Sequence, residues 1–406
     1  MMKIGIFGNT NNYPFRLAQG LKALGHEVRL VLNRKKILHR PEGLYPEWAG
    51  AYPDWVFDCA NIATDEDIAY QTPAIDQAIR HLTDNLDLVI LNDSGPALSS
   101  YLRSPHVALL TGSDLSFYSN FDSLQLRTNL WTPEFKRSPE GRRYLLNFSN
   151  CIARQRDGIL AADLVCYPHR GLVPTGDQLL DDIGVQDQRR LMLPLSNTDD
   201  LQPKPLPQNE RLTILSGCRI NYRPEQNLAL SEIDFKGTDV LIQGFAKFIK
   251  SGGQGELRLV RKGKDLEAAF ALIAALGIEA YIRWLDDMPL SQFYDEMAAA
   301  DLVCDQFGTS FPAMVSFDAY ALGRPVMANL RNEIFGQRFS EGLPGFDAST
   351  PDKIAEHLIL LERNHDILAY MGLKSRAYAE QFLSSESMAK QLLNRLEGSI
   401  LPDDKN

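Results

Sequence analysis

The order of apolar runs along the chain constrains its fold more than any other feature of the sequence. A short apolar run over residues 3–8 ends in glycine, a stretch with helical spacing of leucines follows at 15–24, and a second apolar run covers 26–32. A strand, a helix and a strand in this order form the first unit of a doubly wound parallel sheet. Further strands are expected at 87–91, 107–110, 164–167 and 191–193.

A polar stretch with three prolines, residues 197–209, interrupts this alternation. Such a stretch is typical of a domain boundary. The alternation then restarts, with strands expected at 212–215, 257–260, 280–284, 302–304 and 325–328. Helices are expected at 238–249, 290–299 and across most of 352–396. The sequence therefore predicts an α/β protein with two Rossmann-like domains.

The predicted boundaries follow from this pattern. The N-terminal domain covers residues 1–200, a linker covers 201–210 and the C-terminal domain covers 211–380. Residues 381–406 are expected to form a helix and tail that cross back onto the first domain. Ligands of doubly wound sheets bind at the carboxyl ends of the strands, so the site is expected in a cleft between the domains.

The bulk composition excludes several classes of protein. The net charge of −10 argues against a nucleic-acid binder. The five cysteines form no C-x-x-C pair, which predicts reduced thiols, and Cys166 and Cys304 are expected as buried strand residues. No apolar run approaches the roughly 20 residues that span a bilayer. We expect a cytoplasmic protein, with peripheral membrane contact left open.

Several phrases in the second half carry a family resemblance. They are Asp-Gln-Phe-Gly at 305–308, Ser-Phe-Asp-Ala-Tyr-Ala-Leu-Gly-Arg-Pro-Val at 316–326, Lys-Gly-Thr-Asp-Val-Leu at 236–241, and the strand at 257–263 that ends in Gly263. Together they resemble the donor domain of the GT-B glycosyltransferases of the retaining family 4 type. The resemblance implies a GT-B fold, a nucleotide-sugar donor held by the C-terminal domain, and Gly263 on the donor side.

The donor is expected to be held by cations. A departing nucleotide diphosphate carries negative charge, which cations and a helix N-terminus can neutralise. Arg219 and Lys236, the latter followed by Gly237, are the candidates, with Arg223 as the substitute for Arg219. The resemblance implies that Asp318 contacts the nucleotide ribose, and a helix N-cap is the alternative.

The sequence departs from the family pattern at one position. The usual pattern has a glutamate eight residues before the second acidic residue, and Ser310 stands there, eight residues before Asp318. The nearest upstream acid is Asp305, followed by Gln306. Some bacterial polysaccharide glycosyltransferases look similar here, which implies that Asp305 and Gln306 hold the donor sugar or the diphosphate, with Asp305 as a catalytic residue.

The acceptor side is expected in the N-terminal half. Gly8 and Asn9 open the loop after the first strand, and Asn92 and Asp93 end a later strand. Asp114 follows the next strand, where a catalytic carboxylate would lie, and a helix cap is its alternative. Asp114 opposite the leaving group would be a general base and the enzyme would invert; otherwise the family resemblance implies retention.

Other polar features have simpler interpretations. The seven histidines show no metal-ligand spacing, so no metal or cofactor is expected. His26 fits a structural turn. His169 follows a strand near the expected site, and a functional role is the alternative to a structural one for it. The basic run at 34–40 is typical of a solvated face, or of a site for an anionic acceptor or lipid head group. The rivals to a transferase are a GT-B sugar-nucleotide epimerase, a phosphorylase, and an inactive scaffold.

Overall fold

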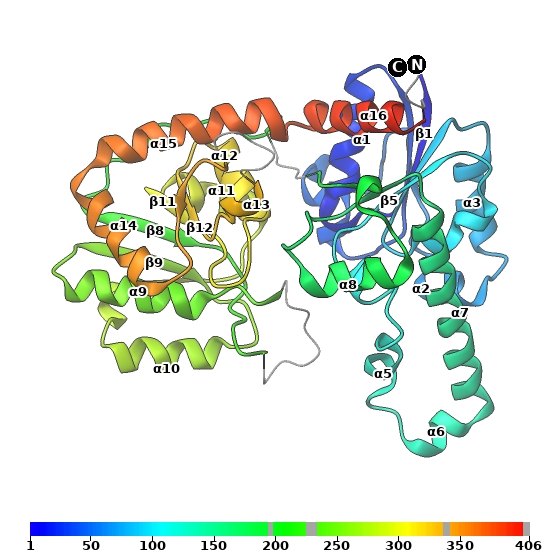
Figure 1. Ribbon diagram of the computed structural model, residues 1–406, viewed down its shortest axis with the longest axis horizontal. Coiled ribbons are helices and arrows are strands. Elements are labelled where there is room, and N and C mark those ends of the chain that lie inside the picture. The colour runs from blue at the N-terminus through cyan, green and yellow to red at the C-terminus, as the bar shows by residue number, and fades with distance from the viewer. Residues whose placement is uncertain (194–197, 225–233, 336–341, 401–406) are drawn as a thin grey trace. The chain divides into compact units, whose positions relative to one another are not determined.

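The computed structural model describes residues 1–193, 198–224, 234–335 and 342–400. They belong to two compact units, shown in Figure 1. Unit 1 comprises Met1–Leu193 and Ser385–Asn406, and unit 2 comprises Pro194–Ser384. Each unit has its own parallel sheet.

The described part of unit 1 holds a seven-stranded sheet in the order β3-β2-β1-β4-β5-β6-β7. All of its pairings are parallel, and Phe7 of β1 pairs with Val31 of β2 and with Leu91 of β4. The strand order reverses between β1 and β4, which makes this the point where such folds bind ligands. The strands are β1 (Lys3–Phe7), β2 (Glu27–Leu32), β3 (Val56–Asp58), β4 (Leu88–Asn92), β5 (His106–Leu109), β6 (Leu164–Cys166) and β7 (Arg190–Leu191).

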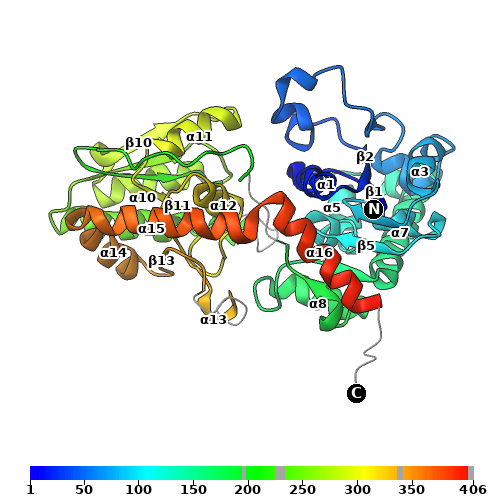
Figure 2. The ribbon, with the colours of Figure 1, turned by 90° about the horizontal axis from the view of Figure 1, so that it is seen from above.

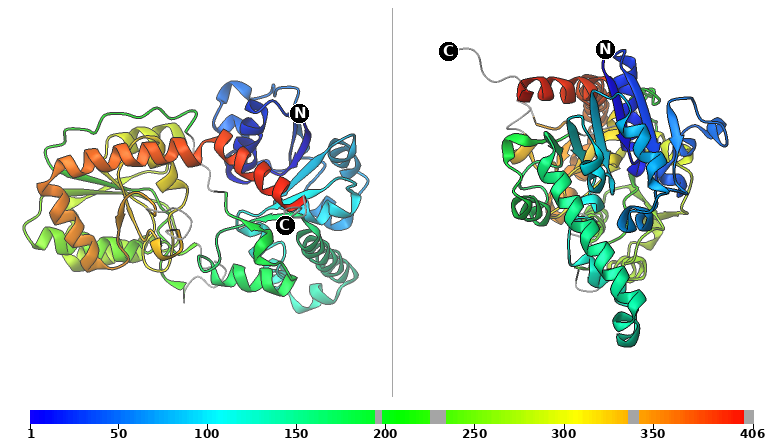
Figure 3. Two further views of the ribbon diagram at one scale, coloured as in Figure 1. Left: turned by 45° about the horizontal axis from the view of Figure 1, so that its top comes forward. Right: turned by 90° about the vertical axis from the view of Figure 1, so that its right-hand side faces the viewer.

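Helices cover both faces of this sheet. Because β1, β4 and β5 are buried on both faces, their side chains are almost wholly apolar. Figure 3 shows α7 extending beyond the sheet, with α5 and α6 near its far end. The helices of unit 1 are α1 (Tyr13–Ala23), α2 (Asp65–Tyr70), α3 (Ile75–Thr83), α4 (Ser113–Ser116), α5 (Ser123–Thr128), α6 (Pro133–Arg137), α7 (Pro139–Ala161), α8 (Pro174–Ile183) and α16 (Ser385–Ile400).

The C-terminal helix α16 packs closely against α1. A Cβ atom at Gly20 of α1 would lie 2.0 Å from the carbonyl oxygen of Ser385. Glycine at this position therefore allows the two backbones to approach each other. Met388, Ala389 and Leu392 of α16 are fully buried. The end of the chain thus belongs to the core of the unit that its beginning forms.

The described part of unit 2 holds a six-stranded parallel sheet in the order β10-β9-β8-β11-β12-β13. Its strands are β8 (Leu212–Ser216), β9 (Gly255–Val260), β10 (Ile282–Leu285), β11 (Leu302–Cys304), β12 (Val326–Ala328) and β13 (Phe346–Asp347). Its helices are α9 (Thr238–Lys250), α10 (Leu266–Leu276), α11 (Leu290–Ala298), α12 (Met314–Ala321), α13 (Asn332–Phe335), α14 (Pro351–Arg363) and α15 (His365–Tyr378). A π-helical turn, Ala379–Leu383, follows α15.

The predicted linker is attached to unit 2. Arg324 is fully buried and donates from one terminal nitrogen to the carbonyl oxygens of Lys204 and Pro205, at 3.1 and 2.7 Å. Arg376 donates to the carbonyl oxygen of Leu201 at 2.7 Å. The boundary between the units falls between Leu193 and Pro194, and the proline-rich stretch that is described packs as part of unit 2.

The strand and helix predictions agree closely with these elements. The predicted strands at 87–91 and 212–215 correspond to β4 and β8, and the predicted helix at 238–249 corresponds to α9. β3 and β13 were not predicted, because they contain only three and two residues and carry little pattern of their own. The 23-residue helix α7 lies between the strands predicted at 107–110 and 164–167, where no individual helix was predicted.

Candidate functional site

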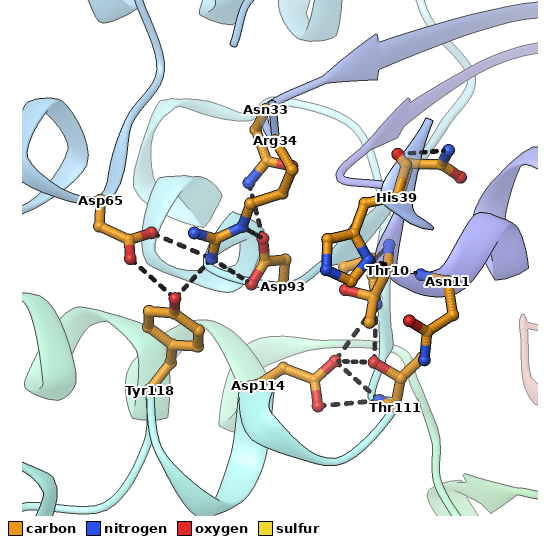
Figure 4. Close-up of polar contacts among 12 residues, drawn as sticks. Thr10, Asn11, Asn33, Arg34, His39, Asp65, Asp93, Thr111, Asp114 and Tyr118 are labelled. Atoms are coloured by element: carbon orange, nitrogen blue, oxygen red, sulfur yellow. Dashed lines mark hydrogen bonds and ion pairs between the residues drawn. The ribbon is translucent and has the colours of Figure 1, made fainter. Parts of the chain in front are cut away.

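Polar side chains gather at the carboxyl ends of the strands in each sheet. The two groups are described separately below. Figure 4 shows the group in unit 1.

In unit 1, Asn92 at the end of β4 ties three strands together. Its Oδ1 accepts a hydrogen bond from the backbone N–H of Thr10 at 2.9 Å, and its Nδ2 donates to the carbonyl oxygen of Leu109 at 2.8 Å. Gly8 has φ +85°, and a Cβ atom there would lie 2.7 Å from the Asn92 carbonyl oxygen. Asn92 is fully buried, so its contacts hold the loop after β1 in place.

Asp114 is fully buried and its carboxylate is surrounded by donors. The backbone N–H of Thr111 lies 2.8 and 2.7 Å from its two oxygens, and the N–H of Gly112 lies 2.8 Å from Oδ1. Burial raises the pKa of Asp114 to about 6, although the hydrogen bonds from Thr111 and Gly112 act in the opposite direction. This geometry favours a role in fastening the loop after β5 over the catalytic role that the sequence predicts.

Asp93, which follows β4 with φ +61°, pairs with Arg34. The two guanidinium contacts are 2.5 and 2.7 Å, and Asn33 donates to the same carboxylate at 2.8 Å. Arg34 also lies 3.0 Å from Asp65 and donates to the hydroxyl oxygen of Tyr118 at 2.5 Å. Figure 4 shows these side chains converging on the guanidinium group. The positive charge of Arg34 is therefore paired within unit 1. Burial acts to lower the pKa of Arg34, but the paired carboxylates outweigh it and raise the pKa.

The basic run at 34–40 is only partly a solvated face. Lys35 and Lys36 are exposed, whereas Arg34 and Arg40 are held by ion pairs. Arg40 bonds to Asp58 at 2.6 Å and to the hydroxyl of Tyr52 at 2.6 Å. The connection that follows, from β2 to β3, lies beside α1 (Figure 2). Four half-buried or buried rings pack together there, namely Phe15, Tyr45, Trp48 and Trp55.

Asn9 connects this basic run to the loop after β1. Its Nδ2 donates to the carbonyl oxygen of His39 at 3.0 Å, and its Oδ1 accepts from the N–H of Phe15 at the start of α1 at 2.9 Å. Asn9 is buried, so its amide positions both loops. His39 therefore lies at the carboxyl edge of the sheet. The sequence pattern missed it as a site residue, because nothing local distinguishes it from a surface histidine.

In unit 2, Lys236 and Gly237 stand at the start of α9. Lys236 Nζ donates to Gln306 Oε1 at 3.1 Å, and Ser310 donates to the same oxygen. Gly237 has φ +65°, and a Cβ atom there would lie 2.7 Å from the carbonyl carbon and oxygen of Phe307. Since no side chain caps α9, the N-terminus of this helix opens at the same edge as Lys236.

Asp305 is buried and joins the two loops that follow β8 and β11. Its Oδ2 accepts from the N–H of Ala313 at 2.7 Å and from the hydroxyl of Ser316 at 2.7 Å, and the thiol of Cys218 lies 3.0 Å from Oδ1. Asp305 thus satisfies donors at the start of α12. These contacts favour a structural role over the catalytic role that the sequence predicts.

The cations beside Asp305 have different environments. Arg219 is exposed, and its guanidinium group makes no hydrogen bond or ion pair with the part of the chain that the structure describes. Arg223 is half-buried, and its backbone N–H donates to Asp265 at 3.0 Å. Gly263 has φ +140°, and a Cβ atom there would lie 2.3 Å from the carbonyl oxygen of Ile220. Gly263 therefore lets the loops after β8 and β9 pack together.

Asp318 lies inside α12, four residues after Met314, where the helix begins. The N-cap residue is Ala313, so the helix-cap alternative for Asp318 is wrong. Its carboxylate is largely buried and accepts a hydrogen bond from the hydroxyl of Tyr294 at 3.2 Å.

The remaining sequence-based candidates are structural or are not grouped. His26 accepts a hydrogen bond from the backbone N–H of Met2 at 3.2 Å, and His169 is half-buried beyond β6. All five cysteines are buried free thiols. Over the described residues, no group of three or more His, Cys, Asp or Glu is placed to hold a metal ion. Within the same residues, every helix is too short or too polar to cross a bilayer.

Comparisons with known proteins identify the fold. No protein-family model matches the sequence, and no curated protein matches it. Solved structures do match over nearly the whole chain. HepE of Anabaena, solved with UDP and glucose, has a TM-score of 0.58 and 17% identity, covering 98% of this chain and 100% of that one. A glycosyltransferase of Rickettsia africae has a TM-score of 0.60 and 14% identity, covering 100% and 99%.

A third match is TarM of S. aureus, a variant solved with UDP and sugar ligands. Its TM-score is 0.57 at 10% identity, and the match covers 98% of this chain and 100% of that one. The two parallel-sheet units and these matches define the class of fold. The chain has the GT-B fold of glycosyltransferases.

Proposed function

We propose that this protein is a glycosyltransferase that moves a sugar from a nucleotide-sugar to a hydroxyl group of an acceptor. The donor binds at the carboxyl edge of the sheet in unit 2, and the acceptor binds at the corresponding edge in unit 1. We further assign it to the hexosyltransferases of the retaining family 4 type, acting without a metal in the cytoplasm. An acceptor on a lipid carrier would bring it to the membrane surface.

One observation carries the donor site. Three features that attract anions lie at the same edge: Arg219 follows β8, Lys236 precedes α9, and the N-terminus of α9 opens there. The loops after β8 and β11, which surround them, contact each other. The Arg219 guanidinium is without a partner in the described residues, and Lys236 Nζ donates to the neutral Gln306. A diphosphate is a suitable ligand for cations beside a helix N-terminus, and the helix dipole adds to the attraction.

Asp318 supplies a second contact to the donor. A carboxylate can accept hydrogen bonds from both hydroxyls of a ribose ring. Asp318 is 7% exposed, and the Tyr294 hydroxyl occupies one of its oxygens at 3.2 Å. The nucleotide would then lie along α12 with its diphosphate toward α9.

The chemistry follows from the charges. The bond between the anomeric carbon and the diphosphate oxygen breaks, and a bond from that carbon to the acceptor oxygen forms. Arg219, Lys236 and the helix N-terminus stabilise the charge on the departing diphosphate. The acceptor hydroxyl attacks on the face that the diphosphate leaves and transfers its proton to the leaving phosphate oxygen; attack on that face gives retention. The saturated hydrogen bonding of Asp114 and Asp305 supports this route over one with a protein base.

The first test is turnover of a defined donor. HepE was solved with UDP-glucose, so UDP-glucose is the first probe, followed by UDP-galactose, UDP-N-acetylglucosamine and GDP-mannose. Proton NMR of each reaction, with p-nitrophenyl glycosides as acceptors and with EDTA present, reports transfer, hydrolysis and anomeric configuration together. We expect an α-linked product from an α-linked donor, and loss of turnover in Asp318→Asn.

Each rival gives a different spectrum. An epimerase changes the donor sugar and leaves it attached to the nucleotide. An inactive scaffold binds a nucleotide and leaves every donor intact, and that result would contradict the proposal. A β-linked product would keep the transferase and overturn retention.

A further inference from the structure

His39 occupies a fixed position beyond the carboxyl end of β2. It ends the short 3-10 turn Ile37–His39, and the backbone on both of its sides is anchored. Asn9 Nδ2 donates to the carbonyl oxygen of His39 at 3.0 Å, and Asn12 Nδ2 donates to that of Arg40 at 3.0 Å. The two asparagines also bond to each other at 2.7 Å. A side chain on so constrained a segment is pre-organised.

One ring nitrogen of His39 is committed to the protein. The backbone N–H of Asn11 donates to His39 Nδ1 at 3.0 Å. A backbone N–H cannot accept a hydrogen bond, so Nδ1 must carry its lone pair and the neutral ring must carry its proton on Nε2. Asn11 adopts φ +54°, a conformation that aims this N–H group at the ring.

The other ring nitrogen makes no hydrogen bond with the described residues. In Figure 4 it points away from Asn11, toward the side of the site where Asp93 lies. Burial lowers the pKa of His39, the positive charges of Arg34 and Lys36 act in the same direction, and Asp93 opposes them. The ring is therefore neutral at pH 7 and presents an Nε2–H donor that has no partner among the described residues.

We propose that His39 is an acceptor-binding residue whose Nε2–H donates a hydrogen bond to an oxygen of the acceptor substrate. This rests on the proposed function, and it names a contact that the proposed donor site does not contain. Since Nε2 already carries the proton, His39 orients a lone pair of the acceptor and does not remove its proton. The nearby guanidinium group of Arg34 and carboxylate of Asp93 are paired with each other, so the Nε2–H donor suits an uncharged hydroxyl or ring oxygen of a sugar.

Two substitutions distinguish the roles of the two ring nitrogens of His39. His39→Asn keeps an acceptor near the position of Nδ1 and removes the Nε2–H donor. His39→Gln places an amide N–H near Nε2 and removes the acceptor for Asn11. His26→Asn is the matched control, because a backbone N–H also bonds to its Nδ1 and it lies before β2, at the other end of the strand.

The assay uses the full chain with UDP-glucose and a panel of p-nitrophenyl glycosides. We expect His39→Asn to lower kcat/KM for the acceptor about tenfold, while UDP binding and hydrolysis of UDP-glucose stay unchanged. His39→Gln should retain most of the acceptor kcat/KM and lose thermal stability. His26→Asn should match the wild type in acceptor kinetics.

The outcomes separate this inference from the proposed function. If His39→Asn transfers normally while His39→Gln does not, the ring only fastens the loop and the inference fails, although the transferase stands. If no nucleotide-sugar is bound or hydrolysed, the proposed function fails and this inference fails with it. Should UDP-glucose be hydrolysed without any glycoside being accepted, nitrogen-15 NMR of His39 decides. An Nε2–H tautomer with a pKa below 6.5 is expected, and an Nδ1–H tautomer overturns the inference.

Discussion

The carboxyl edges of the two sheets differ in how their charges are arranged. In unit 1, Arg34 is enclosed by Asp93 and Asp65, and Asp114 is enclosed by backbone N–H groups. In unit 2, Arg219 makes no ion pair with described residues and Lys236 bonds to a neutral amide. The same fold thus pairs its guanidinium group with carboxylates at the edge of unit 1, here called the balanced edge, and leaves Arg219 exposed at the edge of unit 2, here called the positive edge.

Under the proposed function, this difference explains how two similar sheets would bind two different substrates. A positive edge with a helix N-terminus attracts a diphosphate, which is the charged part of the donor. The balanced edge would bind an uncharged hydroxyl through directed hydrogen bonds, because its guanidinium group is already paired with carboxylates. The internal pairs of unit 1 hold the loops in place, and we expect their loss to affect folding more than turnover.

The largest expected effect is on the positive edge. Arg219→Ala and Lys236→Ala should each lower kcat/KM for the nucleotide-sugar about 100-fold, since each removes charge stabilisation of the leaving group. Lys250→Ala is the control, because it is an exposed cation at the other end of α9. Steady-state kinetics with UDP-glucose measure the effect. Equal rates for Lys236→Ala and Lys250→Ala would remove the distinction between the two edges.

The geometry of the positive edge is tested by Gly237→Ala. The substitution combines a left-handed backbone with a clash 2.7 Å from Phe307, and we expect it to cost about 2–4 kcal/mol of stability. Gly252→Ala shares the positive φ but meets nothing within 4 Å, so it should cost only about 1–2 kcal/mol. Thermal unfolding compares the two. Similar losses would show that the contact between Gly237 and Phe307 does not fix the start of α9.

The balanced edge is tested by the pH dependence of Asp114. Its pKa is raised to about 6, above the value of about 4 in an unfolded chain. The folded protein therefore holds this proton more tightly, so the stability it contributes is complete below about pH 4 and is lost as pH rises through about 6. We expect the wild type to lose about 1–3 kcal/mol relative to Asp114→Asn over this range.

Urea unfolding followed by tryptophan fluorescence measures this difference, because three of the four tryptophans, Trp48, Trp55 and Trp131, lie in unit 1. Parallel pH curves for the wild type and Asp114→Asn would show that the carboxylate stays ionised in the fold. If Asp114→Asn folds normally but loses all sugar transfer, that result would support a catalytic role for Asp114.

The smallest expected effect is that of Tyr118→Phe. It removes a hydroxyl that donates to Asp65 at 2.8 Å and accepts from Arg34. We expect a loss of about 1 kcal/mol in stability and a change in kcat/KM of less than twofold. Phe117→Tyr, at the residue that precedes Tyr118, is the control. A large loss of turnover with unchanged stability would place the Arg34 cluster in contact with a substrate.

The fold could be predicted because its signals are local. Apolar runs and helical spacing repeat along β1, α1 and β2, and the alternation restarts at β8. β3 and β13 were missed because pairing with a neighbouring strand, and not their own composition, makes them strands.

The site was predicted only in part, because its contacts join distant residues. Arg34 and Asp93 are 59 residues apart, and Asn11 and His39 are 28 apart. No periodicity reveals such pairs. The asparagines at 9, 11 and 12 were the available signal, since asparagine tolerates positive φ and its amide can hold two chain segments together.

Nucleotide binding to the positive edge tests the central claim most directly. Thermal unfolding of the wild type and of the Arg219→Ala/Lys236→Ala variant would be followed with UDP, GDP, ADP, dTDP and CMP. We expect one diphosphate to stabilise the wild type by about 2.7 kcal/mol at 100 times its dissociation constant, and to leave the variant unchanged. Equal stabilisation of both proteins, or none of either by any nucleotide, would contradict the account.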